Sequence, residues 1–223
     1  MEYRYRTFVR EGVGMVGRPR DEQARNVILR RAADIASRNG LAGLSIGGLS
    51  GELGLSKSGL FGYFGSKEEL QLATVRAAAQ IFITEVVQPA LSAPPGLGRV
   101  WRLCESWLTY SQRRVFPGGC FFFTVAVEFE GRPGRVRDAV AAASLDWRRL
   151  VVRTIEDARQ LDQLIGSTDA EQLAFELIAL METANSVSLL HDEVIAYQRA
   201  CTAIQERLRP LATDHTALPW APS

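Results

Sequence analysis

Lysine and histidine are scarce in this sequence of 223 residues. Only two of its 26 basic residues are lysines, Lys57 and Lys67, and its only histidines are His191 and His215. Neither a glycine-rich phosphate loop nor a nucleophile elbow follows a strand-like segment. Catalysis by a histidine base or a histidine-bound metal therefore has little support. A helical enzyme is the least favoured function, and we expect neither a cofactor nor a metal.

Cysteine is also rare, and its three positions lack the spacing of metal ligands. Cys104, Cys120 and Cys201 lie in otherwise apolar segments, which predicts reduced, mostly buried thiols rather than a disulfide framework. Cys120 follows the Pro-Gly-Gly of residues 117–119, at an expected helix start where a thiolate is stabilised. Two roles stay open for Cys120, a structural thiol or a reactive one.

Long hydrophobic runs and a signal-peptide pattern are missing as well. Apolar residues make up 47% of the chain, enough for a substantial core. No run approaches the ~18 uncharged apolar residues that a membrane span needs, and residues 1–12 contain no apolar stretch of signal-peptide length. We therefore expect a soluble, cytoplasmic protein with no membrane partner. Met15 is a second possible translation start.

Alternation with a period of two residues, which is typical of β-strands, is absent. Apolar residues instead recur with helical spacing between breaks such as SAPPG at 92–96 and EGRPG at 130–134. The apolar run 120–129 could pass for a buried strand, but no partner strand accompanies it, so we predict a helix there. The expected fold is all-α, with about nine helices.

The predicted organisation has four parts. Residues 1–20 contain five arginines without periodicity and are expected to form a flexible basic arm. A first helical domain at 21–67 begins with a helix at about 21–38, a second helical domain follows at 68–212, and 213–223 form a flexible tail. Residues 1–70 carry 11 Lys+Arg against 8 Asp+Glu, so a polyanionic partner would meet the first third of the chain.

Residues 44–72 contain seven glycines, although their apolar residues repeat with a helical period. Each glycine inside a helix costs about 1 kcal/mol relative to alanine, so the segment needs a reason to keep them. Ser45 and Ser56 can each cap a short helix, and Gly54 lies in the turn between the two helices. Two short helices joined by a tight turn with glycine indicate a helix-turn-helix.

The outward face of the second short helix is nearly bare. At 100° per residue, Leu60 and Phe64 point into the core, whereas Ser58 and Gly62 point away from it. Glycine on a face that presses against a DNA groove lets the backbone approach closely. This face therefore predicts contact with a DNA groove.

Both lysines fit the same hypothesis. Lys57 lies in the first turn of the second short helix, where it can reach a base edge or a phosphate. Lys67 opens the next helix, whose free amide groups and positive dipole end would bind a phosphate together with its ammonium group.

The segment LSIGGLSGELGLSKSGLFGYFGSKEELQL, residues 44–72, resembles the DNA-binding signature of the TetR (tetracycline repressor) family of one-component transcriptional regulators. The similarity covers residues of about 21 to 72, and beyond Leu72 it is one of architecture only. It implies a helical ligand-binding and dimerisation domain. It also implies a homodimer, formed through the last two long helices at about 169–190 and 192–209, on a double-stranded DNA operator.

The resemblance also implies roles for individual residues. Ser45 stands where the family usually has a threonine that touches phosphate, and Phe61 stands where it usually has a tyrosine. Phe61 lacks the hydroxyl for a phosphate contact, although its ring could meet a thymine methyl. Residues 17–20 resemble a minor-groove arginine arm or form an ordinary tail. The predicted DNA-binding residues are Arg18, Arg20, Ser45, Gly47, Ser56, Lys57, Ser58, Gly59, Phe61, Tyr63 and Lys67.

Aromatic residues gather in the second part of the chain. Any one of them is explained by core packing, but as a set they favour a cavity with flat walls. Asn185 is a possible polar anchor, and with Glu182 one turn away it could instead bond across a dimer interface. The predicted ligand-binding residues are Trp107, Tyr110, Cys120, Phe121, Trp147 and Asn185.

The sequence thus predicts a ligand-responsive repressor that binds an inverted-repeat operator and is released by a small apolar or aromatic molecule. The long helix from Ser66 to about Gln88 would carry the signal between the two domains. An alternative keeps the DNA binding but makes covalent modification of Cys120, by oxidation or by an electrophile, the trigger.

Overall fold

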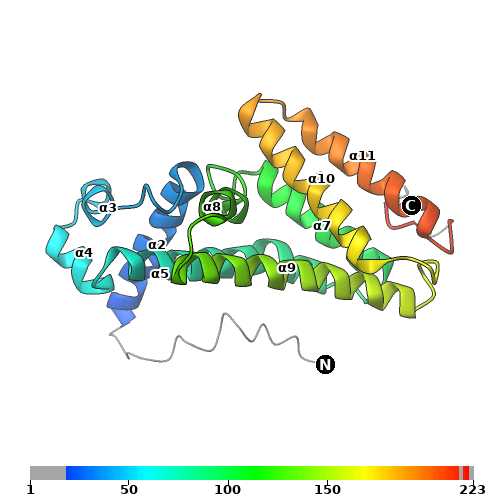
Figure 1. The fold of residues 1–223 in the computed structure, drawn as a ribbon, viewed down its shortest axis with the longest axis horizontal. Coiled ribbons are helices and arrows are strands. Elements are labelled where there is room, and N and C mark those ends of the chain that lie inside the picture. Colours follow the sequence, from blue (N-terminus) through cyan, green and yellow to red (C-terminus); the bar gives the residue numbers. More distant parts are fainter. Residues whose placement is uncertain (1–18, 216–217, 221–223) are drawn as a thin grey trace. The chain divides into compact units, whose positions relative to one another are not determined.

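The computed structural model describes residues 19–215 and 218–220, and within them the chain is helical throughout (Figure 1). Nine helices follow one another when α5, η1 and α6 are counted as one continuous helix, and no strand lies in this part of the chain. The all-α prediction is confirmed. The elements are α2 (Pro19–Asn39), α3 (Ile46–Leu53), α4 (Lys57–Phe64), α5 (Lys67–Phe82), the π-helical η1 (Ile83–Val87), α6 (Gln88–Leu91), α7 (Leu97–Gln112), α8 (Phe121–Phe129), α9 (Arg135–Gln160), α10 (Ala170–Leu190), α11 (Ile195–Leu208) and the 3₁₀ turn η2 (Arg209–Leu211).

The described chain forms two compact units. Unit 1 comprises the residues up to Ile81 together with Phe116–Asp146, and unit 2 comprises Phe82–Val115 together with the residues from Trp147 onward. The chain passes from one unit to the other inside α5, between Val115 and Phe116, and inside α9. These units group residues by contact, whereas the predicted boundary at residue 67 divides the chain by function, and that functional boundary stays a prediction.

Helix α2 begins two residues before its predicted start, and Pro19 and Arg20 form its first turn. Proline is well suited to the first helical position because its missing N–H is not needed there. Asp21 and Glu22 lie in the same turn, where the helix dipole favours acids. The helix ends before Gly40, whose φ of +71° is a left-handed conformation that glycine adopts without strain.

The long helix that starts at Lys67 changes its winding before a proline. It continues as the π-helix η1 at Ile83–Val87 and then as α6 up to Leu91. Pro89 has no backbone N–H, and its ring would crowd the carbonyl group of Glu85 in a regular α-helix. The π-helical turn, which ends two residues before the proline, widens the helix at Glu85 and relieves this crowding.

The apolar run at 120–129 forms helix α8, as predicted. Phe121 and Val125 are buried one turn apart, while Val127 is 59% exposed. This burial follows a helical rather than an alternating pattern. Within unit 1, α8 packs against α2.

Two helical stretches are long and apolar enough to cross a membrane when judged by length and composition, Lys67–Leu91 and Ala170–Leu190. In the first, 61% of the most apolar window is buried inside the protein, as in a core helix. In the second only 39% is buried, so helix α10 has a large solvent-exposed apolar face.

Part of the predicted C-terminal tail packs onto unit 2. Leu218 is buried, and the ring centroid of Trp220 lies 5.4 Å from that of Trp101. This differs from the expectation of a flexible tail over 213–223, because an aromatic ring so close to the chain end finds an apolar surface to cover.

Candidate DNA-binding surface and effector site

Helices α3 and α4 form the predicted helix-turn-helix in unit 1 (Figure 1). The hydroxyl oxygen of Ser45 accepts a hydrogen bond from the amide of Gly48, and that of Ser56 accepts one from the amide of Gly59, each at 3.0 Å. Gly54, with a φ of +64°, ends α3 in the left-handed conformation. The caps and the turn glycine therefore set the two helices apart by the short turn that the sequence predicted.

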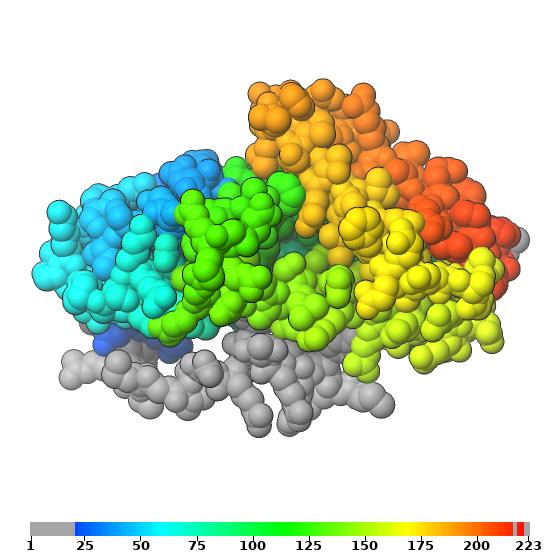
Figure 2. All heavy atoms as spheres, viewed as in Figure 1, coloured from blue at the N-terminus to red at the C-terminus, as the bar shows by residue number. Residues whose placement is uncertain are grey.

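The two helices bury one face each and leave the other open. Leu49 of α3 and Leu60 and Phe64 of α4 are buried. Figure 2 shows the pale blue and cyan atoms of this segment at the surface in that view. The predicted contact residues Ser45, Ser56, Lys57, Ser58, Gly59, Phe61 and Lys67 are exposed, whereas Gly47 and Tyr63 are half-buried.

The outward glycines are not required by the described fold. An added Cβ at Gly51 of α3 or at Gly62 of α4 would meet no atom within 4 Å, and neither residue has a positive φ. Alanine would therefore fit at both positions and would favour the helix. A surface that presses against these helices from outside, such as DNA, is a physical reason to keep glycine there.

Lys57 and Lys67 have different local surroundings. The Cε atom of Lys57 would lie 3.4 Å from a Cβ added to Gly47, so the lysine stem passes over the first turn of α3. The ammonium group of Lys67 donates a hydrogen bond of 2.6 Å to the carbonyl oxygen of Ala42. Neither lysine has a carboxylate partner among the described residues. Both ammonium groups therefore carry a charge that an external anion can use.

The predicted N-terminal arm falls largely outside the described residues. Arg18 lies among residues 1–18, and Arg20 belongs to the first turn of α2. A minor-groove contact by either residue stays a prediction.

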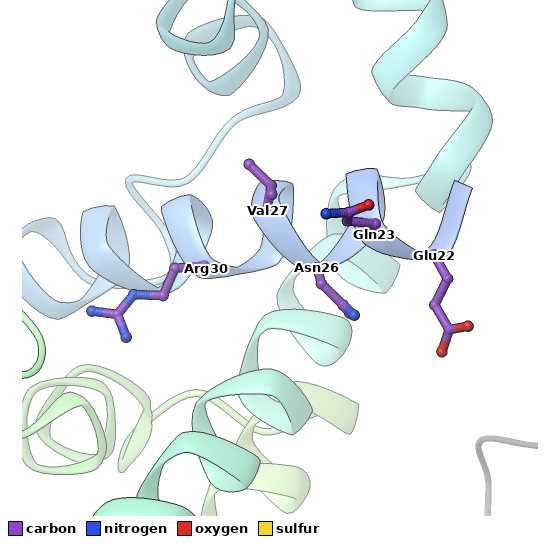
Figure 3. A pocket seen from close by; sticks show the side chains of 5 residues that line it. All are labelled: Glu22, Gln23, Asn26, Val27 and Arg30. Atoms are coloured by element: carbon purple, nitrogen blue, oxygen red, sulfur yellow. The ribbon is translucent and has the colours of Figure 1, made fainter. Parts of the chain in front are cut away.

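A hollow on unit 1 lies along α2. Its volume is about 540 Å³, and Figure 3 shows that all five lining side chains come from this one helix. No second element contributes a polar group that would select a ligand, so this hollow does not qualify as a binding site. The lining residues are Glu22, Gln23, Asn26, Val27 and Arg30.

The predicted effector residues of unit 2 lie in its aromatic core. Trp107 and Tyr110 of α7 are both 2% exposed, and their ring centroids are 6.5 Å apart. Phe82, which the sequence analysis did not select, meets Tyr110 and Trp147 edge to face at 5.5 and 5.2 Å. Edge-to-face pairs are well-packed arrangements. Phe82 therefore joins the rings of Tyr110 and Trp147 into one cluster.

Two of the six predicted effector residues, Cys120 and Phe121, belong to unit 1. Cys120 is the N-cap residue of α8 and is 3% exposed, and Phe121 is fully buried. The Phe121 ring contacts Phe116 and Phe122, with centroids 5.7 and 5.2 Å apart. The prediction of a helix start at Cys120 is confirmed, but its burial keeps reagents from the thiol in this conformation.

Asn185, the predicted polar anchor, belongs to a buried hydrogen-bond network in unit 2. Its Oδ1 atom accepts a hydrogen bond of 2.8 Å from Ser111, whose hydroxyl also lies 2.8 Å from that of Tyr197. Arg114 donates to the same tyrosine hydroxyl at 2.7 Å, and so does Ser188 at 2.9 Å. Sequence analysis missed Arg114 and Tyr197, since nothing in their local pattern indicates a shared partner.

Glu182, one turn before Asn185, is a half-buried carboxyl group. Burial raises its pKa above the ordinary glutamate value because water stabilises the ionised form less well there. No described residue forms an ion pair with it. A cationic group bound next to Glu182 would stabilise the ionised form of this carboxyl group.

A second hollow, of about 390 Å³, lies between α7 and α11 in unit 2. It contains none of the six predicted effector residues. Among the described residues no group of three or more histidine, cysteine or acidic side chains is placed to hold a metal ion. The lining residues are Glu105, Leu108, Thr109, Gln112, Val194, Ile195, Tyr197, Gln198 and Cys201.

Two family comparisons match this chain. Residues 28–74 match the family described as "Bacterial regulatory proteins, tetR family", and residues 96–204 match the "Tetracyclin repressor-like, C-terminal domain". No curated protein sequence matches the chain.

Solved structures of such regulators share the fold. A TetR transcriptional regulator from Chloroflexus aurantiacus is 23% identical with a TM-score of 0.78, covering 86% of this chain and 98% of its own. A regulator from Saccharomonospora viridis, solved in complex with choline, is 20% identical with a TM-score of 0.74, covering 86% and 100%. The reduced form of Escherichia coli NemR is 17% identical with a TM-score of 0.67, covering 82% and 96%.

Proposed function

Because this chain belongs to the TetR family of DNA-binding transcriptional regulators, we propose that it is a repressor that binds an inverted-repeat operator as a homodimer and leaves it when a small molecule binds. The observation that carries the proposal is the pair α3–α4 with its capped, outward-facing helices, together with Lys57 of α4 and Lys67 of α5, which are exposed and have no carboxylate partner among the described residues. DNA is the polyanion that suits this surface.

In this proposal α4 lies in the major groove. Lys57, Ser58 and Gly59 meet base edges, and the ring of Phe61, which is 54% exposed, lies against a thymine methyl. Ser45 at the start of α3 and Lys67 at the start of α5 bind phosphates. Because the outer face of α4 carries few side chains, its backbone can approach the floor of the groove closely. Ser58, with its short side chain, and Gly59, with none, need this close approach to contact the bases.

A homodimer follows from how little one copy can read. A single short recognition helix with few hydrogen-bonding side chains does not give operator-level affinity, whereas two copies on an inverted repeat do. In unit 2, α10 and α11 expose large apolar side chains that suit a partner copy. These are Phe175 (67% exposed), Leu190 (75%), Val194 (58%) and Ile195 (46%).

The effector is a small apolar or aromatic molecule that is bound in the second domain. The cluster of Phe82, Tyr110 and Trp147 supports this, because aromatic side chains form flat walls. A regulator with a similar fold was solved with choline, and aromatic faces also bind quaternary ammonium ions. The half-buried Glu182 would favour such a cation. An effector screen should therefore include organic cations beside neutral aromatic compounds.

Release requires a path from the effector to the reading helices. The continuous helix from Lys67 to Leu91 begins next to α4 and passes from unit 1 into unit 2, and α9 also passes between the units. A shift at the far end of either helix would change the distance between the two helix-turn-helix units of the homodimer. An effector that favours another separation by about 3 kcal/mol would lower operator affinity more than a hundredfold.

Selection of bound fragments from genomic DNA tests the DNA-binding part. We expect enrichment of an inverted repeat with half-sites about one helical turn apart. Enrichment of single half-sites, or of no sequence, would contradict the proposal.

The effector part needs variants that still fold, because alanine at the buried Trp107 would cost about 3–5 kcal/mol. Trp107→Phe and Tyr110→Phe keep most of the packing. Titration of the operator complex with an effector found by screening should give a shifted dose response in at least one variant. Unchanged responses in both would place the pocket elsewhere.

A further inference from the structure

Glu128, near the end of α8, accepts hydrogen bonds from two consecutive backbone amides of the loop between α2 and α3. The amide of Leu41 donates to Oε2 at 2.6 Å, and the amide of Ala42 donates to Oε1 at 2.7 Å. The Glu128 side chain is only 14% exposed. Hydrogen bonds from backbone amides to a carboxylate are charge-assisted and stronger than those between neutral groups, so this carboxylate fixes the loop.

Helix α5 holds the carbonyl groups of the same two residues. Gln71 donates through Nε2 to the carbonyl oxygen of Leu41 at 2.7 Å, and Lys67 donates through Nζ to that of Ala42 at 2.6 Å. The loop therefore lies between an acid of α8 on its amide side and two donors of α5 on its carbonyl side. Since the amide of Ala42 and the carbonyl of Leu41 belong to one peptide group, donation to the carboxylate also strengthens that carbonyl as an acceptor.

The sequence leaves room for this carboxylate at Gly40. A Cβ added to Gly40 would lie 2.3 Å from Oε2 of Glu128, and the φ of +71° is itself unfavourable for other residues. The loop is thus shaped around the Glu128 carboxylate, and any other residue at position 40 would push it away.

Lys67 is kept free of acids on its own helix. Its neighbours Glu68 and Glu69 both pair with Arg135 of α9, at 3.0 and 2.8 Å. Lys67 retains two N–H donors beyond its bond to Ala42, and its side chain is exposed. A lysine that is already anchored at one point loses less side-chain freedom when it binds an anion.

We infer that Glu128 is a positioning residue for DNA binding, which acts through Leu41 and Ala42 to hold the ammonium group of Lys67 in place for a DNA phosphate. The inference rests on the proposed contact between Lys67 and phosphate. It assigns to α8 an indirect influence on DNA affinity, because a movement of α8 that withdraws Glu128 releases the loop carbonyl to which Lys67 is anchored.

A double-mutant cycle of Lys67→Met and Glu128→Gln tests the inference. The probe is a short, labelled, random-sequence DNA duplex, titrated at salt concentrations between about 50 and 200 mM. Glutamine keeps the shape of Glu128 but accepts only one of the two amides. Each single variant should bind more weakly and lose about one unit of salt dependence per subunit. The double variant should bind DNA no more weakly than the single variant with the lower affinity, because both changes remove the same contact between Lys67 and a phosphate.

The control is Arg132→Ala, which removes an exposed partner of Glu128 at 3.5 Å without touching the loop, and should leave DNA binding unchanged. If Glu128→Gln does not fold by circular dichroism, Glu128→Asp replaces it, since a side chain shorter by one methylene cannot reach both amides. Additive losses with an intact Lys67 effect would overturn the inference and leave the phosphate contact standing. Unchanged binding of Lys67→Met would overturn both.

Discussion

Gly118 lies directly on the backbone of Ser37. Its amide donates a hydrogen bond of 3.0 Å to the Ser37 hydroxyl oxygen, and a Cβ added to it would lie 2.0 Å from the Ser37 carbonyl oxygen. This contact joins the segment before α8 to the last turns of α2 within unit 1. Since α2 leads into the loop that Glu128 holds, the Gly118 contact and the Glu128 bonds hold adjacent parts of the chain, the last turn of α2 and the loop after it.

Gly118→Ala should destabilise the protein by about 1–3 kcal/mol or more, because the new methyl group has to displace backbone rather than a flexible side chain. Thermal unfolding followed by circular dichroism would measure the loss. Gly131→Ala is the matched control, since a Cβ there meets no atom within 4 Å, and its effect should stay within about 0.5 kcal/mol. Equal melting temperatures for the two variants would contradict the close contact.

Gly62→Ala should separate stability from DNA binding. Alanine fits at this outward position of α4 and should stabilise the helix by about 0.4–1 kcal/mol, yet its methyl group would hold the helix away from a groove. Gly98→Ala, in the first turn of α7 and equally unobstructed, should stabilise without a change in affinity. A Gly62→Ala variant that binds operator as tightly as the parent protein would show that α4 does not need its bare face.

Lys57→Ala should chiefly relax sequence preference. A lysine that reads a base edge contributes about 1–3 kcal/mol of discrimination, so affinity for the selected operator should fall more than affinity for random DNA. Competition between the two duplexes measures the ratio. Equal losses on both duplexes would make Lys57 a phosphate contact, a reading that its position over Gly47 at the start of α3 also permits.

Phe175→Glu should weaken the homodimer. A charge placed on the exposed apolar face of α10 would have to be buried without a partner, which is costly. Light scattering at micromolar concentration should report a dimer for the parent chain and a monomer for the variant. Leu161→Glu, at a residue that is 52% exposed after α9, is the control and should stay dimeric. A monomeric parent chain would contradict the homodimer.

The three thiols should differ in reactivity. Burial raises the pKa of Cys104 to about 12, and burial together with the nearby charge of Glu105 raises that of Cys201. A raised pKa lowers the thiolate fraction near neutral pH, so alkylation of Cys201 should be slower than that of a free thiol and should rise as the pH increases. Cys104 and Cys120, which are both buried, should react after Cys201 in the folded protein. Mass spectrometry after timed alkylation gives the order, and early modification of Cys120 would favour the covalent trigger.

Interactions between residues close together in the sequence determined the helices and the helix-turn-helix. Ser45 caps α3, Ser56 caps α4, and Gly54 forms the turn between the two helices. Each of these interactions joins groups that are at most a few residues apart. The helical period separates Leu60 and Phe64 from the outward positions of the same helix. The apolar run 120–129 was assigned correctly because the sequence shows no second strand-like segment that could pair with it. These features need only neighbouring residues, so the order and type of the elements could be predicted.

The sequence could indicate the proposed effector site only through its amino-acid composition. Aromatic residues in the second part of the chain were visible, but Phe82 was missed, although it joins Tyr110 to Trp147. Whether a ring lines a cavity or fills the core depends on its neighbours from other helices. The same holds for Asn185, whose partner Ser111 lies 74 positions away.

Only the tertiary structure decided how the loop before the helix-turn-helix is held in place. Glu128 lies 87 positions after Leu41, and nothing in either local sequence pairs this carboxylate with the amides of the α2–α3 loop. The pairing arises because α8 packs against α2 and the α2–α3 loop lies within hydrogen-bond reach of α5, which brings together polar groups that have to satisfy each other's hydrogen bonds. Sequence spacing fixes what each helix can present, whereas packing fixes which group it meets.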